Sequence, residues 1–273
     1  MSDTTFVYDP NFSRGNPLAG PGWLAEHPDV NDRPYSVAVS TIPSSVYLPR
    51  LYPDAFQPVV EDQIDTSSCT GNASTAWKEF AYFRRTGRRP NFSRLLTYWG
   101  ARSYRGWQNQ DNGAFIRDCF RWMAEKGVAL ESFHQFKKEN LFLAPSAQVL
   151  EQAARHKVTD ARRVERTDVL KAIASGYPVV GGFTVYNDAV FGEAAQATGL
   201  IRLPRDGERM SGGHAVLFSW YDEALGLVGG PNSWGTRWGR GNRIRPGWFE
   251  MPIDYLLNPS LSDDFWTATD LTL

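Results

Sequence analysis

The chain has 273 residues, of which 42% are hydrophobic and 22% are charged, and its formal net charge is -1. This length and composition are typical of one large globular domain, or of two lobes that share a cleft. A charge this close to zero gives no support to a nucleic-acid partner or to an anionic membrane surface. No apolar run approaches the roughly 18 residues of a membrane span, so we expect no membrane association.

The chain contains two cysteines, Cys69 and Cys119, fewer than a secreted domain of this size often carries. Its first residues, MSDTTFVYDP, have neither the basic nor the apolar region of a signal peptide. We therefore expect a cytoplasmic protein, although delivery by another route would leave the same sequence. No CxxC, HExxH or phosphate-binding loop occurs, so we expect neither a metal nor a cofactor.

Residues 1–45 are rich in Pro, Gly, Asn and Asp and have little periodicity, which predicts an irregular N-terminal arm. Trp23, Tyr35 and Tyr47 indicate that this arm docks on the body of the protein. The arm could also cover a cleft. Residues 46–60 are broken by prolines and are predicted to be extended.

The next part of the chain has a mostly helical pattern. Small and apolar side chains recur at helical spacing over 70–86, over 91–105 and over 114–126. Asn91 or Ser93 is predicted to cap the second of these helices, and a glycine follows the first and the third. The N-terminal half of the body is therefore predicted to be a helical lobe.

Short β-branched or alternating runs follow a predicted helix at 168–175, and they include YPVVGGFTVY, HAVLFSWYD and LGLVGG. We interpret them as antiparallel strands, whereas residues 147–165 give no clear pattern. A helical lobe over about 60–145 and a β lobe over about 175–255 would together make one α+β domain, residues 46–273, with a cleft where the lobes meet.

Cys69 is the candidate nucleophile. It lies in a polar loop at the start of the first predicted helix, where the positive end of the helix dipole favours the thiolate. Gln63, six residues earlier, carries an NH2 group that could donate to an oxyanion beside the sulfur. Cys119 lies on the apolar stripe of a helix and is predicted to pack in the core, and a disulfide between the two would consume the proposed nucleophile.

His214 and Asn232 could supply a base and a group that orients it. His214 follows Gly212 and Gly213 at the start of a predicted strand, which places it at the rim of the β lobe. The side-chain carbonyl of Asn232 can accept the imidazole N–H and fix its tautomer without adding charge. The indole of Trp234 would exclude water from that contact. Two other histidines are expected at the surface, His134 and His156.

This set of residues resembles the active site of the papain-like cysteine peptidases of family C1. Gln63, Cys69, His214 and Asn232 occur in the family's order, with NSWGTRWG around the asparagine. His214 lies 145 residues after Cys69 and Asn232 lies 163 after it, against about 130–150 in the family. The stretch NGAFIRDCFRWMAEKGVALE resembles the bacterial and phage-type branch, which lacks the disulfides of the secreted enzymes. The family's CGSCWAF is here SSCTGNA.

The resemblance implies a two-lobe fold, with a helical lobe, an antiparallel β-barrel-like lobe and a peptide or protein substrate bound between them. It implies that Cys69 is the nucleophile, that His214 is the base and then the acid, and that Asn232 orients the imidazole. Gln63 and the Cys69 N–H would form the oxyanion hole. The positions that match substrate contacts are Asn112, Gly113, Gly212, Gly213, Ala215 and Trp234.

The sequence thus predicts a cysteine peptidase that hydrolyses peptide bonds through a thioester on Cys69. Two alternatives stay open. One is a catalytically inert peptide-binding or structural module on the same fold, and the other is a peptide ligase or acyl transferase that uses the same acyl-enzyme. We expect a monomer without a nucleic-acid partner. No helical pro-domain is recognisable, so the control of activity stays open.

Overall fold

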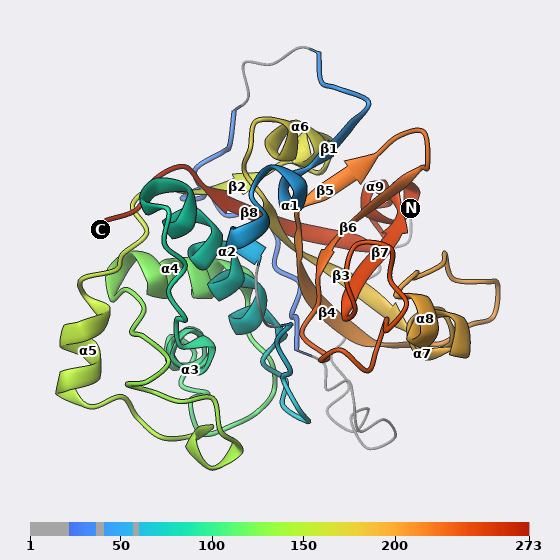
Figure 1. Cartoon of the computed structure of the whole chain (residues 1–273). Coiled ribbons are helices and arrows are strands. Elements are labelled where there is room, and N and C mark those ends of the chain that lie inside the picture. The colour runs from blue at the N-terminus through green and yellow to red at the C-terminus, as the bar shows by residue number, and fades with distance from the viewer. Residues whose placement is uncertain (1–21, 37–40, 57–59, 273) are drawn as a thin grey trace.

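The computed structural model describes residues 22–36, 41–56 and 60–272. The longer helices gather on one side of the chain and the strands on the other, and the two groups meet along α2 (Cys69–Thr86), as Figure 1 shows. This is the two-lobe α+β architecture that the sequence predicts.

The helical lobe is built from α2, α3 (Arg94–Ser103), α4 (Ile116–Glu125) and the peripheral α5 (Ala147–Ala153). α2 ends at Gly87, whose φ of 70° is left-handed and whose N–H bonds the Phe83 carbonyl. α3 begins at Ser93, whose side-chain oxygen accepts from the Leu96 N–H at 3.1 Å. The three helices predicted from periodicity are confirmed, with Ser93 as the cap.

The β lobe contains two four-stranded antiparallel sheets, with strand orders β2-β8-β3-β4 and β1-β5-β6-β7. The strands of the first sheet are β2 (Ala161–Val164), β8 (Ser262–Ala268), β3 (Val179–Tyr186) and β4 (Met210–Phe218). Those of the second are β1 (Ser45–Tyr47), β5 (Trp220–Asp222), β6 (Leu227–Pro231) and β7 (Trp248–Pro252). The short helices that accompany them are α6 (Val169–Ala174), α7 (Asn187–Phe191), α8 (Glu193–Thr198) and α9 (Ile253–Leu257).

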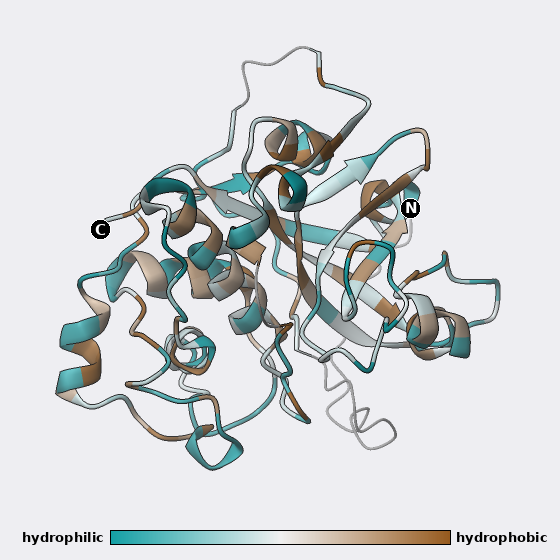
Figure 2. Ribbon diagram, viewed as in Figure 1, coloured by the Kyte–Doolittle hydropathy of each residue, from teal (hydrophilic) through white to brown (hydrophobic). Residues whose placement is uncertain are grey.

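One hydrophobic core continues from the helical lobe into the β lobe. It joins Trp77 and Phe80 of α2 to Val216 of β4 and to Trp248 of β7, all of them buried. Figure 2 shows the hydrophobic residues along the central strands and on the inner sides of the helices, with hydrophilic residues outside. Because the lobes share this core, the start of α2 is held against β4.

The segment predicted to be extended at 46–60 is mostly helical in the part that the structure describes. After β1 it forms α1 (Leu48–Leu51) and a 3₁₀ turn, η2 (Pro53–Phe56). A proline lies in the first turn of each, where its missing N–H would have no helical partner in any case. The prolines therefore start helical turns here instead of marking an extended chain.

Other elements fall outside the sequence prediction. α5, α7 and α8 have at most seven residues each, too few to show a helical period. β2 and β8 lie outside the limits expected for the β lobe. Two histidines were expected at the surface, but His134 is buried and His156 is half-buried, with its ring 5.1 Å from that of Phe92. Among the described residues, no helix is long and apolar enough to cross a membrane.

Loss of the Ser93 cap is expected to destabilise the helical lobe. Ser93→Ala removes the acceptor for the Leu96 N–H and the donor to the buried His134 carbonyl. We expect the free energy of unfolding to fall by about 1–2 kcal/mol in urea denaturation. Ser103→Ala, at the other end of α3, is the matched control and should change it by less than about 0.5 kcal/mol. Equal effects of the two substitutions would contradict the role of the cap.

Candidate active site

Cys69 is the first residue of α2 and is fully buried. The loop before it is held by Asp111, whose two carboxylate oxygens each accept from the Ser67 N–H at 3.1 Å. Asp111 also accepts from the Tyr98 hydroxyl at 2.7 Å, and that hydroxyl in turn accepts from the Gly113 N–H at 3.1 Å. One carboxylate therefore positions both the loop that presents the thiol and the turn that carries Gly113.

His214, on β4, is 2% exposed and bonds the Asn232 side-chain oxygen through Nε2 at 2.7 Å. This is the contact that the sequence predicts. Trp234 stacks on the imidazole with a centroid distance of 4.1 Å, and Phe183 meets its edge at 5.5 Å. Two aromatic rings thus fix the imidazole plane while Asn232 fixes its rotation, so Nδ1 is the ring nitrogen left for another partner.

The thiol and the imidazole come from different lobes and meet through β4. The Cys69 sulfur accepts from the N–H of Ala215, the residue after His214, at 3.4 Å. The nucleophile therefore lies against the backbone that carries the base. Ala215, predicted as a substrate contact, here contacts the thiol itself.

Gln63 is 1% exposed and links the nucleophile loop to the Asn232 loop. Its Nε2 donates to the Thr66 carbonyl at 2.7 Å, and its Oε1 accepts from the Ser233 hydroxyl at 2.7 Å. A side-chain amide has two N–H groups, so one remains for an oxyanion beside Cys69. Ser233 was not predicted as a site residue, because its only signal in the sequence is that it follows Asn232.

Residues 22–36, which we call the strap, pass between the lobes (Figure 1), and Gly22 lies against the thiol. The N–H groups of Gly22 and Trp23 each donate to the Gly213 carbonyl at 3.2 Å. Across from them, the Leu24 N–H donates to the Ala114 carbonyl at 3.2 Å, and the Ala114 N–H donates to the Gly22 carbonyl at 3.1 Å. The strap is thereby bonded to both lobes by its backbone.

The approach of Gly22 to the thiol is very close. A Cβ added to Gly22 would lie 2.2 Å from the Cys69 sulfur and 2.8 Å from the Ser67 carbonyl oxygen. Only glycine fits at this position with the strap in place. The arm residues 1–21 and 37–40 lie outside the described part of the chain.

The predicted substrate contacts have mixed outcomes in this arrangement. The Gly213 carbonyl accepts from the strap, and the Gly113 N–H donates to the Tyr98 hydroxyl. The Asn112 side chain donates to the Gln110 side chain at 2.9 Å and so is turned to its own loop. Gly212 lies in β4 with a φ of 145°, which disfavours a side chain. Ala114, one residue beyond the predicted pair, is the helical-lobe residue that binds an extended segment, and it does so through backbone atoms that leave no sequence signal.

The covered site is uncharged. Burial raises the pKa of the Cys69 thiol to about 12, although the Ala215 N–H lowers it in part. Burial lowers the pKa of His214 to about 4, against the raising effect of the Asn232 hydrogen bond. The sequence predicts that the helix start favours the thiolate, but burial outweighs the lowering effect of the Thr70 and Cys69 N–H groups at that helix start.

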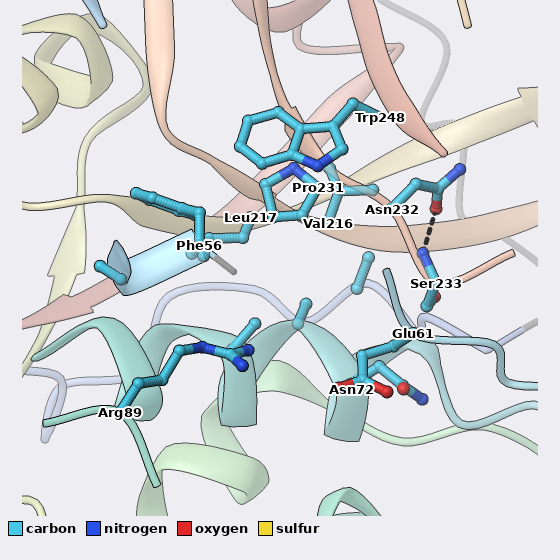
Figure 3. Close-up of a pocket in the computed structure, with 14 residues that line it drawn as sticks. Phe56, Glu61, Asn72, Arg89, Val216, Leu217, Pro231, Asn232, Ser233 and Trp248 are labelled. Atoms are coloured by element: carbon cyan, nitrogen blue, oxygen red, sulfur yellow. Dashed lines mark hydrogen bonds between the residues drawn. The ribbon is translucent and has the colours of Figure 1, made fainter. Parts of the chain in front are cut away.

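A small pocket lies between α2 and the strands near Asn232, and Figure 3 shows Asn72 on α2 below it and Pro231 and Trp248 above it. Its volume is about 40 Å³, on the scale of a water molecule and far below that of a peptide side chain lying in a groove.

Among the described residues, neither Cys119 nor the metal-ligating residue types form a second candidate site. Cys119 is buried in the helical lobe, and neither cysteine forms a disulfide, as the sequence predicts. Within the described ranges, no group of His, Cys, Asp and Glu side chains could hold a metal ion.

Comparison with known proteins identifies the family. No protein-family model matches the chain. The crystal structure of xylellain, a cysteine protease from Xylella fastidiosa, matches with a TM-score of 0.81 and 31% sequence identity over 94% of this chain and 97% of that one. The chain belongs to the papain-like cysteine proteases.

Other relatives of this papain-like cysteine protease agree. An uncharacterized peptidase C1-like protein, L477, of Acanthamoeba polyphaga mimivirus is 28% identical over 222 residues, which are 77% of this chain and 70% of that protein. Procathepsin B S9 from Trypanosoma congolense has a TM-score of 0.69 over 96% of this chain and 89% of that one. At 16% identity, the latter likeness shows the fold alone.

A single methyl group at Gly22 is expected to uncover the thiol. In Gly22→Ala the added carbon clashes with the Cys69 sulfur, so the strap must leave. We expect the rate of Cys69 alkylation by iodoacetamide at pH 7 to rise at least about 10-fold. The rate–pH profile should also move to lower pH, because exposure removes the cause of the raised thiol pKa.

The matched control is Ala25→Ser, which adds one atom to the strap at an exposed position. It should leave the alkylation rate unchanged. A Gly22→Ala protein that reacts no faster than the unmodified chain would show that the strap does not limit access to Cys69.

Proposed function

We propose that this papain-like cysteine protease hydrolyses peptide bonds through a thioester on Cys69. The observation that carries the proposal is the His214–Asn232 hydrogen bond directly beside the thiol, where the Ala215 N–H contacts the sulfur. A thiol, an imidazole and a group that orients the imidazole make up the minimal set for nucleophilic catalysis by cysteine.

The first half of the reaction forms the thioester. Once the strap has left, the imidazole takes the Cys69 proton, and the thiolate attacks the peptide carbonyl carbon. The resulting oxyanion accepts hydrogen bonds from the free Gln63 N–H and from the Cys69 N–H at the helix start. When the C–N bond breaks, the imidazolium gives its proton to the leaving amine.

The second half regenerates the enzyme. Water attacks the thioester carbonyl while His214 takes one of its protons, and the C–S bond breaks to release the acid and the thiolate. The thiolate then recovers a proton from the imidazolium. Asn232 stays hydrogen-bonded to Nε2 throughout, so Nδ1 is the atom that receives and returns each proton.

The strap acts as a cover and not as a substrate in this proposal. Its Gly22 carbonyl oxygen accepts from the Ala114 N–H, so it is not directed at the proposed oxyanion donors, Gln63 and the Cys69 N–H. The strap therefore blocks the thiol without presenting a carbonyl for attack. We infer that the arrangement seen here is a latent form of the enzyme.

An inert peptide-binding or structural module has no need of both a base and a group that orients it, and the intact set supports an enzyme. The choice between hydrolysis and transfer to another amine depends on the second nucleophile, and water is the one that we propose. A peptide or protein substrate, a monomeric protein and a cytoplasmic location complete the proposal.

Loss of the thiol should abolish turnover without unfolding the protein. In the Gly22→Ala background, Cys69→Ala should lower cleavage of a fluorogenic peptide mixture by at least about 10⁴-fold. Cys119→Ala is the matched control, because it removes the other buried thiol, and it should keep activity. Circular dichroism checks the fold of both variants. Comparable activity in the Cys69 variant would overturn the assignment.

Loss of the Gln63 N–H groups tests the oxyanion hole. Gln63→Ala removes the donor together with the bonds to the Thr66 carbonyl and the Ser233 hydroxyl, without placing a charge in the buried site. We expect kcat to fall on the order of 100-fold with little change in KM, because the interaction forms only in the transition state. Gln135→Ala, an exposed glutamine substitution, is the control for a general effect. A lower affinity with unchanged kcat would exclude an oxyanion role.

A further inference from the structure

The side chain of Trp23 fills a pocket in the β lobe next to the proposed active site. Trp23 follows Gly22 in the strap and is 6% exposed. A Cβ added to Gly182 on β3 would lie 1.9 Å from the indole, and one added to Gly213 on β4 would lie 2.6 Å from it. The pocket exists because both neighbouring strands carry glycine where the indole lies.

A buried carboxylate is the polar group in this pocket. The indole N–H of Trp23 donates to Oδ2 of Asp264, which is 0% exposed, at 3.3 Å. The other oxygen, Oδ1, accepts from Trp266 at 2.8 Å and from Arg163 at 3.2 Å. Among the contacts of the described residues, Oδ1 therefore bonds side chains of the β lobe, whereas Oδ2 bonds only Trp23 of the strap.

Asp264 has an uncommon backbone conformation and a buried carboxyl group. Its φ is 63°, in the left-handed region that a residue with a side chain rarely adopts. Burial raises the pKa of Asp264 to about 7, against the lowering effect of Arg163. A left-handed backbone and a buried acid at one position are consistent with a functional role for Asp264.

The position of the pocket relates it to substrates. The backbone of residues 22–24 is bonded to the Gly213 carbonyl and to both backbone groups of Ala114, directly over the thiol. A peptide that replaces the strap must satisfy the same buried groups. An extended segment held there places one side chain in the pocket that Trp23 now fills.

We propose that Gly182, Gly213 and Asp264 form a specificity pocket of this protease, which selects tryptophan in peptide substrates. This inference rests on the proposed function and names its substrate class. The two glycines admit a large flat side chain, and Asp264 Oδ2 accepts its N–H. Asp264 is the specificity-determining residue.

The chemistry favours tryptophan over the two nearest competitors. Phenylalanine matches the shape of the pocket but leaves the buried Oδ2 atom without a donor, which costs free energy. Arginine brings donors, but Arg163 already pairs with Asp264, so a second guanidinium would enter beside a like charge. An aromatic ring with one N–H fits both constraints.

The test uses the full chain with Gly22→Ala and Trp23→Ala, which frees the thiol and empties the pocket together. Fluorogenic peptides carry tryptophan, 1-methyltryptophan, phenylalanine or arginine at each position in turn. We expect one position at which tryptophan gives a kcat/KM about 10- to 100-fold above the other three. The 1-methyl compound deletes the donor without changing the enzyme. Equal rates for tryptophan and 1-methyltryptophan, or a preference for arginine, would overturn the inference.

A second variant tests the pocket without disturbing the carboxylate. Gly182→Ala, added to the same chain, narrows the pocket and should remove the preference for tryptophan while smaller residues are still cleaved. Gly241→Ala, at an exposed glycine in the β lobe, is its matched control and should keep the preference. A preference for tryptophan that survives in Gly182→Ala would place the specificity pocket elsewhere.

A binding measurement separates this inference from the proposed function. Calorimetry of a tryptophan peptide and its 1-methyl analogue is carried out with the same chain carrying Cys69→Ala. Tighter binding of the tryptophan peptide supports the pocket even if no peptide is ever cleaved, in which case the proposed function alone fails. Cleavage without any tryptophan preference in rate or binding means that the pocket inference alone fails.

Discussion

Burial of the Cys69 thiol at the junction of the two lobes is the constraint on which the rest of the site depends. Because a buried site disfavours charge, burial raises the thiol pKa and lowers the His214 pKa. An enzyme of this kind needs the opposite, a thiolate beside an imidazolium. The shared core fixes where the two lobes bring these groups, and we infer that departure of the strap, which lies against the thiol, allows them to ionise.

The strap is anchored to the protein at positions away from the thiol as well as at the thiol. Arg117 of the helical lobe pairs with Glu26 and Asp32 of the strap at 2.7 Å, and Arg105 of the same lobe pairs with Glu26 at 2.8 Å. Trp23 enters the β lobe on the other side. Burial of an aromatic side chain contributes about 1.5–3 kcal/mol, whereas an ion pair that is largely buried, as Arg117–Asp32 is, offsets its Coulombic gain by desolvation. Trp23 is therefore the main anchor, and the pocket that holds it ties latency to specificity.

The contacts that were predicted from the sequence are those between side chains whose chemistry can be inferred from residue type and spacing. Cys69 was predicted from the helical period that follows it, and the pairing of His214 with Asn232 was predicted from the sequence motifs around them. The sequence did not predict the path of the strap, because Gly22 and Leu24 bind through backbone groups that any residue has. Nor did it predict Asp264, whose place beside Trp23 depends on how β8 pairs with β3. The short helices α5, α7 and α8 were missed because they are set by tertiary packing and not by a period of their own.

Competition between the strap and a bound ligand for the same backbone groups is the central claim. Amide hydrogen exchange of the full chain, before and after an epoxysuccinyl inhibitor modifies Cys69, tests it most directly. The account predicts that the amides of Trp23 and Leu24 are protected in the free protein and lose protection after modification, while the strands of both sheets stay protected. Strap amides that stay protected with Cys69 modified would show that the strap and the ligand occupy different places, and would contradict the account.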